Sequence, residues 1–386
     1  METKELDNDY VAHAYGRFNV TLNNGKGSTI SDDSGKQYID FGSGIGVTAF
    51  GICDDEWKAA VETQLDKMQH VSNLYYTEPC ARLAKMLCDK TGMKKVFFGN
   101  SGAEANEGAI KFARKYSYDK YGEGRSTIIT LVNSFHGRTI TTLAATGQDS
   151  FHTVFGPFTP GFKYCPANDI EMLNEMATDD VCAIMFECVQ GEGGVNNLDY
   201  NFVKAIEKLA KEKDILMVVD EVQTGNGRTG RYFAYENFDI KPDIVSTAKG
   251  LAGGLPMGAV LFGEKVKDTV TPGSHGSTFG GNPVCAAGAI SIVSRIDDKF
   301  LKSVREKSEY IKNFLMNIKG VKSVSGMGLM LGVETQKDAK QIASECLENG
   351  LLVLTAKTKI RLLPALNISY LELDRGLKIL KEVIEK

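Results

Sequence analysis

Short apolar segments alternate with helical segments from about residue 96 to residue 262. The apolar segments are of strand length and rich in β-branched residues, which is typical of strands buried on both faces of a parallel sheet. Their alternation with helices predicts an α/β fold, in which helices cover both faces of a doubly wound, mostly parallel sheet. The expected strands are 96–98, 127–132, 182–186, 215–219, 244–247 and 259–262.

The pattern changes after Pro283. A long helical stretch over about 284–318 precedes short strands near 321–325, 328–334, 351–354 and 359–363, with helices over 337–349 and 371–385. This mixture predicts a second, smaller α+β domain. We therefore expect an N-terminal segment (1–50) that packs with the small domain, a large domain (51–283) and the small C-terminal domain (284–386).

Composition narrows the kind of protein and its partners. The net charge of −4, with 42% hydrophobic and 24% charged residues, is ordinary for a globular protein and favours neither nucleic acid nor an anionic membrane as partner. No apolar run approaches the roughly 20 residues of a membrane helix, and the N-terminus is too polar for a signal peptide. The eight cysteines show neither a Cys-x-x-Cys pair nor zinc-type spacing. We expect reduced thiols, no metal site and a cytoplasmic location.

Two of the expected strands end next to a charged residue. Asp220 follows 215–219, and Lys249 follows 244–247 and runs into Gly250. In open α/β sheets, ligands bind at the carboxyl ends of the strands. Pyridoxal 5'-phosphate needs a lysine for its aldehyde and a carboxylate for its ring nitrogen. The pair therefore predicts a site for this cofactor, although either residue alone could be an ordinary strand-end aspartate or a solvated lysine.

The segment 100–107 opens a helix directly after the strand 96–98. Asn100 or Ser101 is suited to cap this helix. The free amides of Gly102 and Ala103, together with the helix dipole, predict an anion pocket that would hold the cofactor phosphate. The alternative is an ordinary capped helix.

Three other segments carry candidate ligand-binding residues. Phe135 follows the strand 127–132 and could stack on a flat ring, while Arg138 could bind a carboxylate; the alternatives are a core phenylalanine and a surface arginine. Gln223 could bond the phenolic oxygen of the cofactor. The loop 274–283, with Ser277 and Thr278, is either part of a phosphate site or a plain interdomain loop.

A dinucleotide-type glycine pattern at 225–230 does not indicate a nicotinamide site. That fingerprint needs its first glycine directly after the strand. Here Asp220 and Glu221 come first and would repel a pyrophosphate.

Together these segments resemble the class III pyridoxal-phosphate aminotransferases of fold type I, and most closely their acetylornithine aminotransferase branch. The resemblance covers nearly the whole chain and implies a seven-stranded sheet in the large domain. It departs from the family at 51–55, where other members often have a Gly-His-x-His/Pro segment. Further matching segments are 15–18, 72–76, 190–195, 328–332 and 361–364.

The resemblance implies catalytic roles for Lys249, which binds the cofactor aldehyde, and for Asp220, the partner of the ring nitrogen. It implies that the remaining cofactor contacts come from Gly102, Ala103, Phe135, Gln223 and Thr278. Ser277 and Thr278 match a loop that enters the neighbouring subunit's site, which implies a homodimer. The residues implied to bind substrate are Arg138, Glu192, Ser277 and Arg361.

In such enzymes an acid–arginine pair, here Glu192 and Arg361, lets one pocket accept both an uncharged side chain and 2-oxoglutarate; the alternative is a structural ion pair. The implied reaction is transamination between N-acetylornithine and 2-oxoglutarate in arginine biosynthesis. Alternatives are a sister aminotransferase that acts on ornithine, succinylornithine, succinyl-diaminopimelate or 4-aminobutyrate, an aminomutase, and a non-catalytic protein on an enzyme fold.

Overall fold

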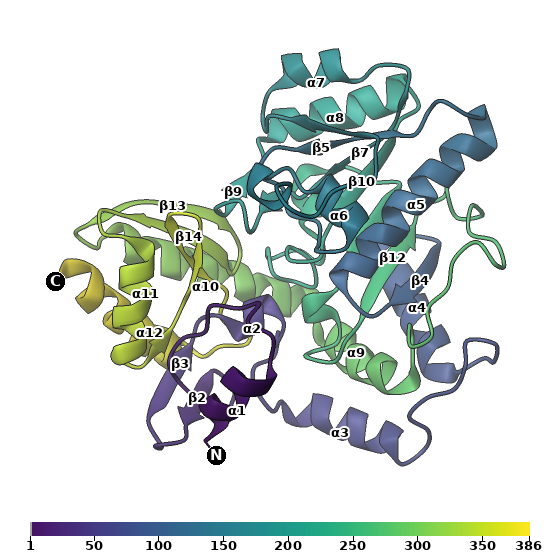
Figure 1. The fold of residues 1–386 in the computed structure, drawn as a ribbon. Coiled ribbons are helices and arrows are strands. Elements are labelled where there is room, and N and C mark those ends of the chain that lie inside the picture. The colour runs from purple at the N-terminus through teal and green to yellow at the C-terminus, as the bar shows by residue number, and fades with distance from the viewer. Residues whose placement is uncertain (1) are drawn as a thin grey trace.

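The computed structural model describes residues 2–386, and its largest element is a seven-stranded sheet in the order β4-β12-β11-β10-β7-β5-β6 (Figure 1). All strands except β12 run in one direction, because β12 pairs antiparallel with both of its neighbours. The predicted fold class is thereby confirmed. The bounds are β4 Lys95–Gly99, β5 Thr127–Leu131, β6 Phe162–Cys165, β7 Val181–Phe186, β10 Leu216–Asp220, β11 Ile244–Thr247 and β12 Gly258–Phe262.

Helices cover both faces of this sheet because the side chains of each strand alternate between them. Val218 of β10 shares an apolar core with Phe112 of α5, whereas the adjacent Val219 shares the opposite core with Phe202 of α8. The helices around the large sheet are α3 Asp55–Leu65, α4 Glu78–Thr91, α5 Gly102–Tyr121, α6 Ile140–Ala145, α7 Ile170–Met176, α8 Tyr200–Glu212 and α9 Pro283–Arg295, with short 3-10 turns η1 Asp149–Phe151, η2 Ala234–Phe238 and η3 Lys249–Leu251.

The C-terminal part is built on an antiparallel sheet in the order β13-β14-β17-β16. The N-terminal segment forms its own sheet, β1-β2-β3, to which β15 from the C-terminal part adds as a parallel strand. The bounds are β1 Leu22–Lys26, β2 Thr29–Asp32, β3 Gln37–Asp40, β13 Val321–Met327, β14 Met330–Thr335, β15 Leu351–Leu352, β16 Leu354–Ala356, β17 Lys359–Leu362, α10 Asp298–Met316, α11 Ala339–Glu348 and α12 Tyr370–Glu385. Short elements elsewhere are α1 Thr3–Tyr10, α2 Ser43–Gly46, β8 Val189–Gln190 and β9 Asn196–Asn197.

The helical stretch expected over 284–318 is two helices. Helix α9 ends at Arg295, and Asp297 caps the start of α10 by accepting a hydrogen bond from the backbone N–H of Phe300 at 2.7 Å. Helix α9 packs against α3 and α4 of the large part, while α10 packs against β13 and α12. The domain boundaries proposed from the sequence stay a prediction.

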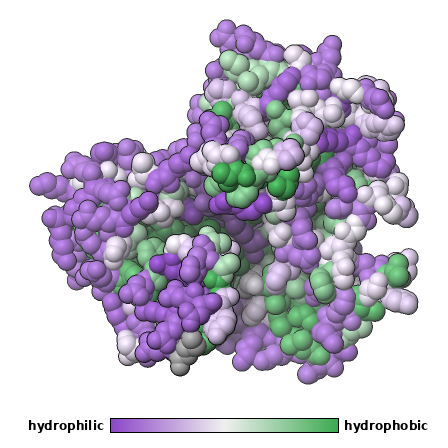
Figure 2. Space-filling view, viewed as in Figure 1, coloured by the Kyte–Doolittle hydropathy of each residue, from purple (hydrophilic) through white to green (hydrophobic). Residues whose placement is uncertain are grey.

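The surface is hollowed where the two parts of the molecule meet (Figure 2). No helix in residues 2–386 combines the length and the apolar character that crossing a membrane requires. Within the same residues, no three His, Cys, Asp or Glu side chains gather as a metal site would need.

Candidate active site

A cavity of about 410 Å³ opens at the carboxyl ends of the parallel strands. It is lined by residues that follow β4, β5, β7, β10 and β11, so one sheet edge collects side chains that are far apart in the sequence. Seven of the predicted site residues line this cavity: Gly102, Ala103, Phe135, Arg138, Asp220, Gln223 and Lys249.

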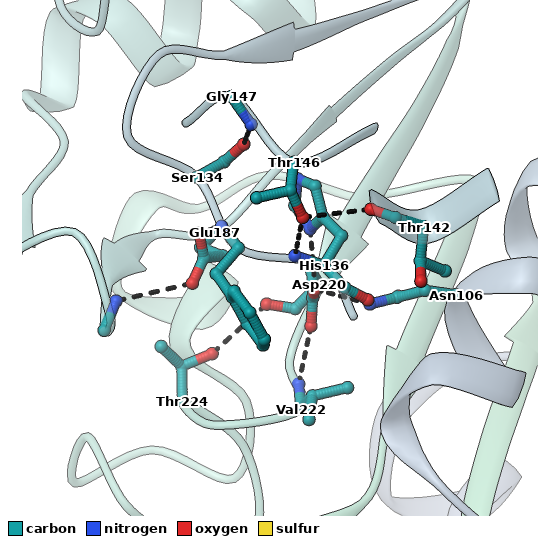
Figure 3. A network of polar contacts seen from close by, with 12 residues as sticks. Asn106, Ser134, His136, Thr142, Thr146, Gly147, Glu187, Asp220, Val222 and Thr224 are labelled. Atoms are coloured by element: carbon teal, nitrogen blue, oxygen red, sulfur yellow. Dashed lines mark hydrogen bonds and ion pairs between the residues drawn. The ribbon is translucent and has the colours of Figure 1, made fainter. Parts of the chain in front are cut away.

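Asp220 is the last residue of β10, and its side chain is held by three donors (Figure 3). The Asp220 Oδ1 atom accepts the backbone N–H of Val222 at 2.9 Å. The Oδ2 atom accepts the side-chain amide of Asn106 at 2.7 Å and lies 2.8 Å from His136 Nδ1. The carboxylate is only 3% exposed, so its orientation toward the cavity is determined before any ligand binds.

His136 and Asn106 are functional candidates that the sequence reasoning did not assign. The ring of His136 bonds Asp220 from a fully buried position. Burial by itself would lower the pKa of His136, but the hydrogen bond and the negative charge of Asp220 outweigh burial and raise it. Asn106 lies one turn into α5, within the segment 100–107, whose earlier residues Gly102 and Ala103 form the predicted anion pocket.

Lys249 begins the η3 turn two residues after β11. Its φ angle of 44° is in the left-handed region, which costs a non-glycine residue about 1 kcal/mol or more and is found mainly where function needs it. Burial lowers the pKa of the Lys249 amine, Glu192 acts to raise it and Arg361 to lower it further. A lysine whose pKa is lowered by burial supplies more neutral amine, which is the nucleophilic form.

The start of α5 forms the cavity wall next to Asp220. Ser101 caps the helix by accepting the backbone N–H of Glu104 at 3.1 Å. A Cβ atom at Gly102 would lie 2.6 Å from Val222 Cγ1, so only glycine fits between the helix and this side chain. Free amides at a helix N-terminus that faces a cavity form an anion site.

Phe135 and Arg138 lie on the loop after β5, with a second aromatic ring beneath them. The Arg138 guanidinium carbon is 5.4 Å from the Phe135 ring centre and 4.2 Å from the ring centre of Phe151 in η1. The two rings are 6.0 Å apart in an edge-to-face arrangement. Phe151 was not predicted, because an isolated phenylalanine in an irregular segment gives no signal of its own.

Glu192 and Arg361 form an ion pair, and both contact Gln223, which lines the cavity. Arg361 is 3% exposed and donates to Glu192 and, at 3.3 Å, to Gln223 Oε1. Burial would raise the pKa of Glu192, but the charge and hydrogen bond of Arg361 lower it. The predicted acid and arginine are therefore brought together from β17 and the loop after β8, 169 positions apart in the chain.

Ser277 and Thr278 do not line the cavity of this chain. Asn100 donates to Ser277 Oγ at 3.2 Å, which ties the loop to the start of α5, and Thr278 is exposed on the surface. In a single chain neither residue lines the cavity itself, although Ser277 is bonded to Asn100, which does.

The glycine-rich segment 225–230 has a structural role. Arg228 is buried and donates to the backbone carbonyls of Leu329 and Pro364, at 2.9 Å and 2.6 Å. Because only the short η2 turn follows this segment, it does not present a helix N-terminus as a dinucleotide site would.

The chain is similar to known proteins over its full length. The family model for aminotransferase class-III matches residues 10–384. An acetylornithine aminotransferase of Haemophilus ducreyi is 52% identical (100% of this chain, 99% of that protein), and one of Methanocaldococcus jannaschii is 43% identical (98% and 97%).

Solved structures agree with this relationship. Ornithine aminotransferase from Toxoplasma gondii superposes with a TM-score of 0.94 at 30% identity (100% of this chain, 95% of that chain). N-acetylornithine aminotransferase from Stenotrophomonas maltophilia has a TM-score of 0.85 at 35% identity (98% of each chain). The predicted family is thus confirmed: the chain belongs to the class-III aminotransferases.

Proposed function

We propose that this aminotransferase moves the δ-amino group of N2-acetyl-L-ornithine to 2-oxoglutarate, giving N-acetyl-L-glutamate 5-semialdehyde and L-glutamate, with pyridoxal 5'-phosphate as cofactor. The observation that carries the chemistry is that Asp220 and Lys249 line one cavity from neighbouring strands. The choice of substrate is supported by relatives at 41–52% identity that are named acetylornithine aminotransferases. Such an enzyme serves arginine biosynthesis, and we propose a cytoplasmic location.

The residues around the cavity suit this cofactor. The amides of Gly102 and Ala103 would hold its phosphate, Asp220 its ring nitrogen and Lys249 its aldehyde, while Phe135 would cover one ring face. Asp220 is already fixed by Asn106 and His136 and needs no rearrangement to receive a protonated nitrogen. When bound, the cofactor supplies an electron sink that stabilises negative charge on the substrate carbon.

Lys249 would move the proton. Because burial lowers the pKa of Lys249, a larger fraction of the enzyme carries a neutral amine at this position. The Nζ atom can then accept the proton from the substrate Cδ and donate it again to complete the amino transfer. Arg138 at the cavity wall would bind the substrate α-carboxylate as a bidentate donor.

The Glu192–Arg361 pair would let one pocket bind two different substrates. With the pair closed, as here, the arginine charge is neutralised and the uncharged acetyl-bearing end of the donor can enter. When 2-oxoglutarate binds, Glu192 would release Arg361 to its distal carboxylate.

We further propose a homodimer in which Ser277 and Thr278 of one subunit complete the site of the other. Neither residue lines the cavity of its own chain, and Thr278 is exposed, which supports this arrangement.

A substrate panel tests the proposed donor. The purified enzyme is mixed in single half-reactions with N-acetylornithine, ornithine, succinylornithine and 4-aminobutyrate, and conversion of the cofactor is followed by absorbance. We expect N-acetylornithine to have the highest kcat/KM. A clear preference for ornithine or 4-aminobutyrate would assign the chain to a sister activity. Repeated turnover of a donor in the absence of any oxo-acid acceptor would indicate an aminomutase.

A further inference from the structure

Glu187 is a buried carboxyl group at the cavity that none of the proposed roles uses. It is the first residue after β7, is 5% exposed, and lines the cavity together with Asp220 and Lys249. A carboxyl group is rarely buried without a partner that requires it, so its contacts indicate what it does.

Its two oxygens accept backbone hydrogen bonds from two separate loops (Figure 3). The Oε2 atom accepts the N–H of Phe135 at 3.1 Å, on the loop that also carries Arg138. The Oε1 atom accepts the N–H of Gly191 at 3.3 Å, directly before Glu192. One side chain therefore joins the loop of the ring-facing aromatic to the loop of the arginine's partner.

The loop of Glu192 is held closely at this point. Gln190, next to Gly191, donates its side-chain amide to the carbonyl of Val132 at 2.8 Å. A Cβ atom at Gly191 would lie 2.6 Å from the side chain of Gln223, so the backbone is pressed against the residue that bridges Glu192 and Arg361. A small backbone shift at Gly191 would therefore displace the ion pair.

We propose that Glu187 is a positioning residue that fixes the backbone of Gly191, so that Glu192 engages and releases Arg361 by side-chain rotation alone. This inference rests on the proposed function of the Glu192–Arg361 pair. Glu187 would then influence which of the two substrates binds without contacting either of them.

Replacing Glu187 by glutamine leaves an acceptor for only one of the two backbone N–H groups, those of Phe135 and Gly191. A Glu187→Gln side chain has the same shape but only one acceptor oxygen, and its NH₂ group would face a second backbone N–H. A buried donor left without an acceptor destabilises the local structure. Closure of the ion pair is needed only when the acetylated donor binds, because 2-oxoglutarate uses the open arginine.

The test compares the two half-reactions of the holoenzyme. In Glu187→Gln we expect kcat/KM for N-acetylornithine to fall about tenfold, while that for 2-oxoglutarate stays within about twofold. Glu221→Gln is the matched control: Glu221 is also buried and accepts a backbone N–H, from Tyr235 at 2.9 Å, but it does not line the cavity. An unchanged ratio of the two kcat/KM values would overturn the proposal. If both values fall equally, the effect lies at Phe135.

A second comparison shows whether the effect passes through Glu192. In a Glu192→Ala background the ion pair is already absent, so adding Glu187→Gln should leave the ratio of the two half-reactions unchanged. A further change in the ratio would contradict the proposal. If the unmutated enzyme shows no cofactor absorbance, the proposed function itself is refuted. This outcome is distinct from a failure of the proposal for Glu187.

If Glu187→Gln does not fold, amide hydrogen exchange of the unmutated holoenzyme decides. Segment 188–194 should stay protected with either substrate bound, because the side chain of Glu192 moves while the backbone does not. Exchange at the rate of an unstructured peptide once 2-oxoglutarate is added would overturn the proposal.

Discussion

At the scale of single residues, Asp220 shows how the site is organised before a ligand binds. Its carboxylate takes three hydrogen bonds, from Val222, Asn106 and His136, and each donor comes from a different segment. Fixed donors and acceptors of this kind need little reorganisation when charge develops on a ligand. His136 is the partner whose own charge depends on pH.

The raised pKa of His136 predicts a pH-dependent contribution to stability. Because the folded protein binds this proton more tightly than the unfolded chain, the contribution is fully present below the ordinary pKa of 6.5 and is lost as pH rises through the folded value. In urea unfolding, His136→Asn should therefore cost about 2 kcal/mol near pH 6 and less near pH 9. A cost that is the same at both pH values would show that the charge on His136 does not contribute.

Phe151 predicts a residue-scale effect on substrate binding. The Arg138 guanidinium lies 4.2 Å from its ring centre, and such a contact is worth about 0.5–1 kcal/mol at an exposed site. Phe151→Leu should raise KM for both substrates by about two- to fivefold with little change in kcat, because Arg138 loses its support. Phe158→Leu is the control, since its ring packs on His152 in the same loop; an equal rise in both variants would contradict the assignment.

At the scale of elements, the start of α5 combines helix geometry with close packing. Gly102→Ala should push α5 away from Val222 and weaken cofactor binding, because the new Cβ would lie 2.6 Å from Val222 Cγ1. Overpacking of this kind costs about 1–3 kcal/mol, or roughly a 5- to 150-fold loss of affinity. Equilibrium dialysis measures the loss. The double variant Gly102→Ala with Val222→Ala should recover most of it, and a failure to recover would show that crowding is not the cause.

The elements also show which parts of the fold the sequence predicts. Strands such as β7 and β10 are fully buried, so their apolar runs are unbroken and easy to recognise. Strand β6 was missed because it lies at the edge of the sheet and contains Lys163 among partly buried residues. The break between α9 and α10 was missed because Asp297 interrupts an otherwise helical pattern, although an aspartate there is itself a cap signal.

Reasoning from the residues themselves found the candidate site where side chains follow recognisable strands, whereas Glu192 and Arg361 were expected only from the family resemblance. Asp220 and Lys249 were found in this way, and the cavity brings them together as expected. Glu187 also follows a strand, β7, but a single glutamate before a cysteine carries no chemical pattern. Its significance comes from two backbone N–H groups, on Phe135 and Gly191, whose positions depend on tertiary structure.

At the scale of the whole molecule, exposed apolar side chains form a candidate surface for the proposed second subunit. Leu74, Tyr75 and Tyr76 are 87%, 68% and 107% exposed, and their loop is joined to the loop of Thr278 by Asn73, which donates to the Ser277 carbonyl at 2.9 Å. Large exposed aromatic residues in one region are typical of protein–protein interfaces. The loop proposed to reach the neighbouring site therefore lies beside an apolar surface.

From the proposed dimer we expect that a substitution that disrupts this surface also lowers the activity. Tyr76→Glu should shift the protein toward monomer in sedimentation velocity and lower kcat/KM by at least about tenfold, because a charge buried in an interface is costly. Leu371→Glu changes another exposed apolar residue, on α12, with 71% exposure, and should alter neither property. A fully active monomer of the unmutated protein would contradict the shared site.

The proposed chemistry requires Lys249 and Asp220 to hold the same cofactor molecule. The direct measurement is the visible absorption spectrum and turnover of Lys249→Ala beside the unmutated enzyme, both supplied with pyridoxal 5'-phosphate. We expect the unmutated enzyme to be yellow and active, and the variant to lose both the band of the lysine-bound cofactor and transamination. A Lys249→Ala protein that keeps the band and converts N-acetylornithine would contradict the assignment.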